Sequence, residues 1–594
     1  MGWSPPREHK RWPKLGPWFH FGPFIWWACC SYLGPFEKPN LEKNFVWPNS
    51  HKAHNPLTEI PRGSRSLVPI KHLPTLAAIY VAAEKDDCCS GVAHHIQVWR
   101  MADGGAGRGA QEHIHQEKEE EEEEEIPMEI SCTSEEGLMQ PMSPMSQYVS
   151  NSVLTLAILG VLEFEVPIND LPTYSLIQNV FLSINPRFSS VMVTDEKGVK
   201  RWKKTEVSIK DHIRVPVFPP NKSPEFYDKC FDDYMSEIGL EALPLTRPLW
   251  EIHIVEYPTS NAAGTLIFKL HHALGDGFSL MGALLSCLQR ADNPSLPLTF
   301  PSAKFHSSSG QNNSVFKKIP KIFSSVFNTV SDFFGGVLMS TIMEDDRTPI
   351  RSGANAAQFQ PISFSTMTFS LDQIKQIKSK LGATVNDVIT GAIFLGSRLY
   401  MQEMCHESGK SRSTALVLLN TRMTRSYRSI EDMLKPNAEE PWGNLFSFLQ
   451  IPLPKLPDAN LTDPLQFVVK AGRIIKRKRY SIALHMTSWL LQILNKIRGP
   501  KVVSKFVYGT LKNSSLGITN VVGAQEQMAL SGHPVKGIYF MIVGSPEDVG
   551  FGIMSYMGKL RVAMRVGKEF IDAEKLKTHI ENAFEMIFKA ACGN

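Results

Sequence analysis

The chain has 594 residues, of which 43% are hydrophobic and 21% charged, and this composition is ordinary for a globular protein. At roughly 100–200 residues per domain, the length leaves room for several packed units. The formal net charge of +4 is too small to indicate a nucleic-acid partner. The nine cysteines form no C-x-x-C motif, which favours a reduced, cytosol-facing protein without a zinc site.

Residues 1–138 differ in composition from the rest of the chain. They contain scattered Pro, Gly, Trp and His without a sustained hydrophobic period, and they end in an acidic run at 119–125. Such a run repels itself and cannot bury a core, so we expect a solvated extension. The apolar stretch 19–32 lacks the smooth hydrophobic region of a signal peptide, which favours an unpacked extension over an anchor, and Met101 is a candidate internal start.

The segment 139–320 has the pattern of an α/β unit. We expect a strand at 151–165, a helix at 171–188 that stops near Pro186, and a hairpin at 189–204 that turns at Lys197 and Gly198. We also expect strands at 248–257 and 264–272 and a helix at 277–291.

An apolar linker helix is expected within 321–354, at 322–343. It has about the length that crosses a bilayer, which is roughly 20 residues. Asp332 and several serines interrupt it, and a charge near the centre of a bilayer costs a few kcal/mol. We therefore favour an amphipathic, interface-lying or buried helix over a membrane span.

The segment 355–594 resumes the α/β pattern as a second half of the fold. A helix is expected after Ser370 and before Gly382, and another begins near Thr384. Expected strands lie at 414–422, 444–453, 515–523, 537–544 and 551–566, and a terminal amphipathic helix lies at 573–591.

Two adjacent histidines stand where a strand gives way to a helix. His271 and His272 are followed by Ala-Leu-Gly and then by Asp276 and Gly277, and the two glycines permit a tight turn. Strand ends and the loops beyond them hold functional groups in place. Imidazole titrates near neutral pH, so His272 is a candidate general base with Asp276 holding the ring or the loop. A buried histidine with only structural hydrogen bonds is the competing interpretation, and no third metal ligand is spaced nearby.

This HHxxxDG motif is shared by the CoA-dependent acyltransferase superfamily. The chain resembles the plant-type bifunctional wax ester synthase/diacylglycerol acyltransferase family over 139–594. The motifs that carry the resemblance, besides HHxxxDG, are SPM at 143–145, NPRFSS at 185–190, PLWE at 248–251, DDRTPI at 345–350, TVNDV at 384–388, GN at 443–444, TNVVG at 519–523 and SYMGKLRVA at 555–563. Ala524 stands where proline is more usual in the family.

The resemblance implies a chloramphenicol-acetyltransferase-like α/β (α+β) fold with two subdomains and a tunnel between them. It also implies that His272 is the base, with His271 and Asp276 in supporting positions. The implied reaction transfers a fatty acyl group from acyl-CoA, a co-substrate, to a long-chain alcohol or to diacylglycerol. No cofactor or metal is expected.

The developing oxyanion of such a reaction needs preorganised hydrogen-bond donors. The candidates for donors or substrate contacts are Gly277, Asn386, Asp387, Thr519 and Asn520. Asn386 and Asp387 are equally compatible with a helix cap. The basic cluster at 476–479 fits a solvated face, CoA phosphates or an anionic membrane surface.

Several alternatives share parts of this pattern. A BAHD-like acyltransferase with a soluble acceptor has the same fold, but the chain carries DVGFG at 548–552 where that family has DFGWG. A condensation domain shares HHxxxDG, but no carrier domain follows. Glycerolipid acyltransferases use H-x-x-x-x-D, which would make His271 the base. A non-catalytic lipid-binding protein is the rival from another class.

The substrates set the expected location. Long-chain alcohols and diacylglycerol reside in bilayers, so a membrane surface is the expected partner. The family resemblance implies that the protein is located at the cytosolic face of the endoplasmic reticulum membrane, with the plasma membrane as a second location.

Overall fold

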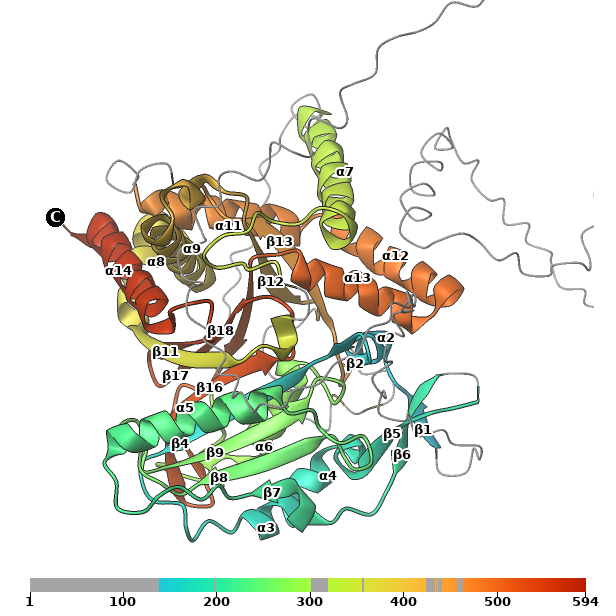
Figure 1. Ribbon diagram of the computed structural model, residues 1–594, viewed down its shortest axis with the longest axis vertical. Coiled ribbons are helices and arrows are strands. Elements are labelled where there is room, and N and C mark those ends of the chain that lie inside the picture. The colour runs from blue at the N-terminus through green and yellow to red at the C-terminus, as the bar shows by residue number, and fades with distance from the viewer. Residues whose placement is uncertain are drawn as a thin grey trace, which may run out of the picture. The chain divides into compact units, whose positions relative to one another are not determined.

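The computed structural model describes residues 138–196, 199–300, 319–354, 357–422, 433, 435, 441–456 and 463–593. The expected extension with its acidic run, and the proposed turn at residues 197–198, lie outside these residues. The described part is built on two mixed sheets flanked by helices (Figure 1).

The first sheet has seven strands. In spatial order these are β10 (Gln289–Arg290), β15 (Met528–Leu530), β16 (His533–Val543), β4 (Ala157–Phe164), β9 (Gly264–His271), β8 (Trp250–Val255) and β7 (Ile213–Arg214). Strands β8 and β9 are buried along their whole length and β4 along most of it, and one face of the β8–β9 pair carries the buried polar side chains of Glu251, His253 and Lys269. In the register of β4 and β9, His271 is opposite Ala157, so the histidine pair lies at the end of a central strand.

The second sheet has six strands from the C-terminal part of the chain. In order these are β11 (Ile362–Ser370), β18 (Lys559–Gly567), β17 (Val549–Tyr556), β14 (Leu516–Val522), β12 (Thr414–Asn420) and β13 (Phe446–Pro452). The three strands β12, β14 and β17 run parallel, and the outer pairs are antiparallel. Small sheets complete the set with β1 (Leu138–Pro141), β2 (Ser150–Asn151), β3 (Leu154–Thr155), β5 (Ser190–Thr194) and β6 (Lys200–Lys204).

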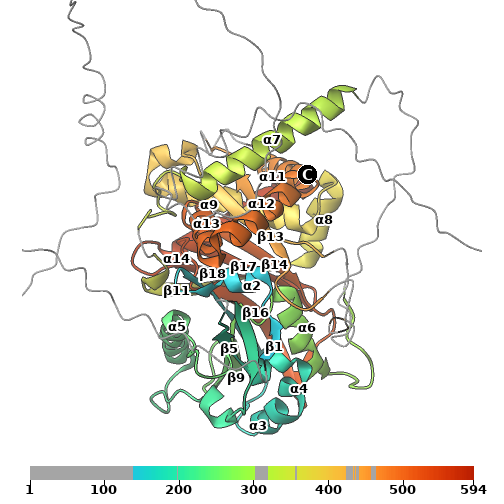
Figure 2. The same ribbon diagram turned by 90° about the vertical axis from the view of Figure 1, so that its right-hand side faces the viewer.

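The α-helices flank both sheets. They are α2 (Pro144–Tyr148), α3 (Thr173–Leu176), α4 (Leu182–Ile184), α5 (Pro224–Leu240), α6 (Gly277–Cys287), α7 (Ile319–Thr341), α8 (Leu371–Leu381), α9 (Val385–Met404), α11 (Leu465–Arg479), α12 (Ala483–Arg498), α13 (Pro500–Lys512) and α14 (Ala573–Cys592). Helices α8, α11 and α14 pack around α9, and the middle of α9, from Val388 to Met401, is largely buried between them and the second sheet. Figure 2 shows α7 lying across the helices at this end.

Several local predictions are confirmed. Ser370 caps α8 and Gly382 ends it with φ +61°, a left-handed conformation that glycine adopts freely. Thr384 begins α9. Strands β5 and β6 pair as the expected hairpin. The helix expected at 171–188 is instead broken into α3, a π-helical turn at Ile177–Phe181 and α4. The extended stretch 551–566 is the hairpin of β17 and β18.

Sheet membership does not follow the expected division of the chain into halves. Strands β15 and β16 come from the C-terminal segment, yet β16 pairs with β4 along eight residues of the first sheet. On its other side β16 packs on β17, and a methyl group added to Gly552 would overlap the carbonyl oxygen of Phe540. The two halves are therefore interlocked by one strand.

The expected linker helix is observed as α7. It packs against α12 and α13, and Phe333 is its buried anchor. Among the helices in the described parts of the chain, none is both long and apolar enough to span a bilayer.

Candidate active site

The histidine pair occupies the turn between β9 and α6. His271 is the last residue of β9, and the backbone N–H of His272 donates to the carbonyl of Leu156 at 2.8 Å, which ties the turn to the start of β4. Asp276 then caps α6 by accepting from the N–H of Ser279 at 3.0 Å. The strand, the cap and the short turn hold both imidazoles on rigid elements.

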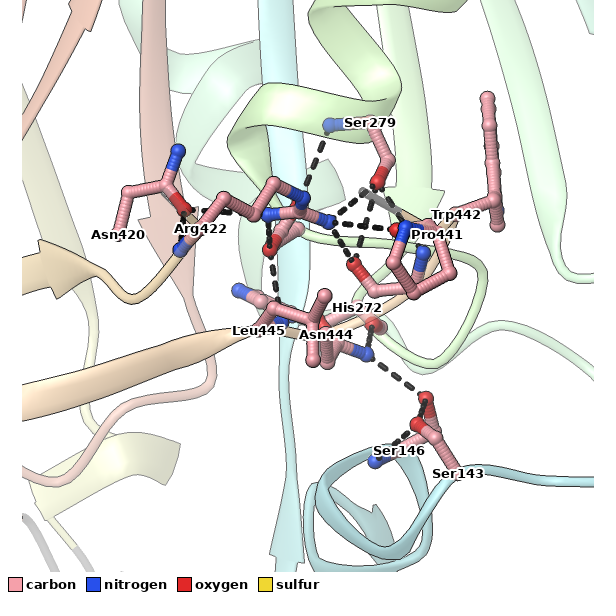
Figure 3. Close-up of polar contacts among 12 residues, drawn as sticks. Ser143, Ser146, His272, Ser279, Asn420, Arg422, Pro441, Trp442, Asn444 and Leu445 are labelled. Carbon is pink, nitrogen blue, oxygen red and sulfur yellow. Dashed lines mark hydrogen bonds and ion pairs between the residues drawn. The ribbon is translucent and has the colours of Figure 1, made fainter. Parts of the chain in front are cut away.

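The ring of His272 is oriented by Asn444 (Figure 3). The Nδ2 group of Asn444 lies 2.7 Å from the carbonyl oxygen of His272 and 2.8 Å from Oγ of Ser146. A carbonyl only accepts, so this end of the amide is the NH₂ group. Oδ1 of Asn444 therefore faces Nδ1 of His272, at 2.9 Å, and Nδ1 must carry the proton.

This tautomer leaves the other nitrogen of His272, Nε2, with a free lone pair. Within the described residues, Nε2 has no hydrogen-bond partner, and the ring lies beside that of Phe446 with centroids 5.4 Å apart. Burial lowers the pKa of His272 below its ordinary value, while the carboxylate of Asp276 acts in the opposite direction. His272 is thus a neutral base near pH 7.

His272 lines a small apolar cavity of about 40 Å³ between the two sheets. The walls come from both, with Leu156, Leu416, Leu418, Phe446, Phe448, Leu511, Gly517, Ile518, Thr519, Met541, Ile542, Ser545, Glu547, Gly550 and Phe551. A second hollow of about 700 Å³ lies further along β16 and has a largely polar lining. Of these two hollows, His272 lines the apolar cavity.

His271 is placed differently. Its Nδ1 accepts from the N–H of Ala273 at 3.0 Å, and its Nε2 is buried without a partner among the described residues. Burial, with the nearby His272 and Lys200, lowers the pKa of His271 to about 3. It is absent from the set of residues that line the apolar cavity. His271 therefore differs from His272 in having no side-chain atom on the cavity wall.

Asp276 holds the loop and not the ring. One carboxylate oxygen accepts from Arg422 at 2.6 Å and from the N–H of Leu445 at 2.9 Å, and the other caps α6. Both charged side chains of the pair are buried. Arg422 also donates to Oγ of Ser279 and to the carbonyl of Gly443, so this one guanidinium joins the HHxxxDG loop to the segment that carries Asn444 (Figure 3).

Other motifs of the sequence converge on the same turn. Ser143 caps α2 and bonds Ser146, which supports Asn444. Arg187 of the NPRFSS motif and the indole of Trp442 both donate to the carbonyl of Leu274, at 3.0 and 2.7 Å. Segments far apart in the chain thus fix one loop from several sides.

The residues predicted as oxyanion donors or substrate contacts do not all lie together in the structure. Thr519 lines the cavity with His272. The side chain of Asn520 is exposed and donates to Asn386 at 3.2 Å. Asp387 forms a capping box with Thr384 at the start of α9, which fits the helix-cap interpretation.

Gly277 allows close packing beside the histidine pair because it has no side chain. It is the first residue of α6, and a Cβ there would lie 3.1 Å from the Val521 side chain of β14. The absence of a side chain lets the two halves approach closely beside the histidines.

Sequence reasoning missed Arg422 and the role of Asn444. Arg422 follows β12, about 150 residues from Asp276, and no local pattern distinguishes it from a surface arginine. The Gly-Asn pair at 443–444 carried a family signal but no chemical one. Both residues contact the HHxxxDG loop only when the two sheets pack together.

Comparison with known proteins agrees with this arrangement. Residues 180–389 match the family described as "Wax ester synthase/diacylglycerol acyltransferase catalytic domain", and residues 442–588 match "WS/DGAT C-terminal domain". Two curated proteins of Arabidopsis thaliana, wax ester synthase/diacylglycerol acyltransferases 4 and 11, are each 29% identical to this chain. The matches span 76% of this chain and 90% and 95% of the relatives.

A solved structure is also similar. It is the wax ester synthase/diacylglycerol acyltransferase from Marinobacter aquaeolei VT8, with 15% identity, a TM-score of 0.48, and coverage of 75% of this chain and 98% of that one. From the family matches and the curated relatives, the protein is an acyltransferase. The chain belongs to the wax ester synthase/diacylglycerol acyltransferase family.

Proposed function

We propose that the protein transfers a fatty acyl group from acyl-CoA to the hydroxyl of a long-chain alcohol or of diacylglycerol, with His272 as general base. The observation that carries this proposal is the fixed tautomer of His272, whose unprotonated Nε2 is left free beside the apolar cavity. A wax ester or triacylglycerol is the product, together with CoA.

The reaction follows from the chemistry of the groups. The acceptor hydroxyl gives its proton to Nε2 of His272 as its oxygen attacks the thioester carbonyl. The carbon–oxygen bond forms, the carbon–sulfur bond breaks, and the imidazolium returns the proton to the departing CoA sulfur. General-base assistance of this kind is typically worth 10²–10⁴ in rate.

Thr519 is the proposed donor to the oxyanion, since it lines the same cavity as His272. The apolar walls suit an aliphatic chain. A volume of about 40 Å³ is smaller than a fatty acyl chain, so lining side chains must move apart when substrate enters.

Location follows from the acceptors. Long-chain alcohols and diacylglycerol are bilayer components, so we expect the enzyme to work at a membrane surface. We propose the cytosolic face of the endoplasmic reticulum, with the plasma membrane as the alternative.

The test is an assay of purified enzyme with labelled palmitoyl-CoA, offered hexadecanol and a diacylglycerol in parallel and resolved by thin-layer chromatography. The His272→Ala variant should lose activity roughly 10²–10⁴-fold toward both acceptors. His406→Ala, a change at an exposed histidine, is the matched control. Near-normal ester formation by His272→Ala would show that another group is the base.

A further inference from the structure

Helix α12 presents an apolar face to solvent. The residues of this face, which we call the α12 ridge, are spaced at i, i+4, i+7, i+11 and i+15, and this spacing puts them on one side of a helix. They are Ile482, just before the helix, and Met486, Trp489, Ile493 and Ile497. Ile482, Trp489 and Ile497 are 63%, 65% and 70% exposed.

The opposite face of α12 accounts for its packing. Leu491 and Leu494 pack into the core cluster beneath α13, and Leu484 packs against the large C-terminal core. Within the helix only Ala483 is fully buried. The ridge is therefore a second apolar face that the packing of the described chain does not use.

The surroundings of the ridge are strongly basic. The stretch 464–525, which contains α11, α12 and α13, has eleven lysines and arginines and no aspartate or glutamate. Lys496, Lys501 and Lys505 are exposed next to or just after the ridge. Arg477 and Lys478 are partly neutralised by Asp332 of α7, at 2.8 and 3.3 Å.

The positive charge around the α12 ridge distinguishes between the partners that could cover it. A second copy of this face would bring like charges together, which opposes self-association. An apolar stripe with a tryptophan, flanked by lysines, is the pattern of a helix that lies in the headgroup region of an anionic bilayer. Each lysine near such a surface adds about 1 kcal/mol of attraction.

The position of α12 connects this face to the active site. Helix α12 packs against α13, and Leu511 of α13 forms part of the cavity wall that His272 also lines. Helix α7 packs on both helices (Figure 2). Its Leu338 is exposed.

We propose that the α12 ridge and its lysines dock the enzyme on an anionic lipid bilayer. The inference rests on the proposed function, because that function requires an acceptor drawn from a membrane. It assigns the contact to a particular helix and to a headgroup charge, and it needs no membrane-spanning segment.

The experiment is flotation of the full chain with vesicles of phosphatidylcholine alone or with about a third phosphatidylserine. The parent should bind the anionic vesicles, and binding should weaken with salt. The double variant Trp489→Ser and Ile497→Ser should lower the vesicle affinity roughly tenfold or more. Replacing Lys496, Lys501 and Lys505 with glutamate should abolish the preference for phosphatidylserine.

The matched control is Val217→Ser with Tyr174→Ser, which removes exposed apolar side chains from the N-terminal part of the fold and should leave binding unchanged. Parent-like binding by the ridge variant would overturn the docking proposal, and so would equal binding to neutral and anionic vesicles. Concentration-dependent dimers that the ridge variant loses would instead assign the face to self-association.

Vesicle binding is measured without turnover, so the two proposals fail separately. Ester synthesis from detergent-dispersed alcohol should be equal in the parent and the ridge variant. If the ridge substitutions leave vesicle binding unchanged while ester synthesis proceeds, only the docking proposal is wrong. If the parent binds through the ridge but makes no ester, only the acyl-transfer proposal is wrong.

Discussion

The sharpest consequence of the site is that Asn444 should control the reactivity of His272. Its amide makes three hydrogen bonds, to Nδ1 and the carbonyl of His272 and to Oγ of Ser146, at 2.9, 2.7 and 2.8 Å. We predict that Asn444→Ala releases the ring from its fixed tautomer and orientation. Since a general base contributes 10²–10⁴ in rate, we expect kcat to fall roughly 10²-fold, less than in His272→Ala.

The same change also affects stability. Two buried groups of His272, Nδ1 and the carbonyl oxygen, lose their partner, while Oγ of Ser146 keeps its bond to Ser143. Each unsatisfied buried group costs about 1–3 kcal/mol. The assay therefore measures kcat with palmitoyl-CoA and hexadecanol well below the unfolding midpoint, and calorimetry confirms that the variant is folded.

Asn151→Ala is the matched control for this prediction. Asn151 is also buried, bonds the carbonyls of Gln147 and Tyr148 and the N–H of Val153, and does not contact His272. It should lose stability and keep kcat. If folded Asn444→Ala retained the parental kcat, the fixed tautomer of His272 would not be what makes Nε2 reactive.

A second substitution at this position tests the charge state. Asn444→Asp keeps an acceptor for Nδ1 but adds a negative charge, which favours the imidazolium and raises the pKa of His272. In the parent, burial holds that pKa below its ordinary value, so activity should persist below pH 6.5. The acid limb of kcat/KM should therefore move to higher pH in Asn444→Asp. An unmoved limb would mean that His272 is not the titrating base.

Three further substitutions test the framework of the site. Arg422→Met leaves the buried carboxylate of Asp276 unpaired and should cost about 3–5 kcal/mol of unfolding free energy. Burial raises the pKa of Glu251, but the nearby His253, Lys269 and Arg214 outweigh it and bring the pKa down to about 2. Ionised Glu251 therefore contributes about 3 kcal/mol above pH 4.5, and this contribution fades as the pH falls toward 2, so Glu251→Gln should show its full deficit only at the higher pH. Gly552→Ala drives a methyl group into the carbonyl of Phe540 and should cost about 1–3 kcal/mol. Urea unfolding measures all three.

Each of these three substitutions has a control variant or an outcome that would contradict it. Adding Asp276→Asn to Arg422→Met should restore part of the loss, because the uncompensated charge is gone. A Glu251→Gln deficit that is equal at pH 7 and near pH 3 would contradict the linkage. Gly567→Ala meets only ordinary contacts, at 3.8 Å from Phe570, so it should be far milder than Gly552→Ala.

Patterns local in sequence predicted local structure well. The caps at Ser370 and Thr384, and the strand that ends in the histidine pair, follow from short-range rules of capping and alternation. The family resemblance predicted the acyltransferase class. Long-range pairing was not predictable, because nothing near Arg422 or Asn444 in the sequence shows which turn they will meet.

The exposed helix α12 illustrates a different limit. Its sequence does not show which apolar residues pack inward, and only the packed structure shows that one side of the helix faces solvent. The same is true of β16, whose apolar pattern predicts a strand but not the sheet that it joins.

The placement of β16 has a consequence for how the enzyme admits its substrates. Because this strand pairs with β4 in one sheet and packs on β17 of the other, the two sheets cannot move apart without separating the packed strands β16 and β17. Entry to the buried histidine must then come from side chains and short loops shifting around a rigid frame. For the same reason, the gene cannot be cut after residue 354 into two pieces that each fold, since the first piece would expose the unpaired edge of β4.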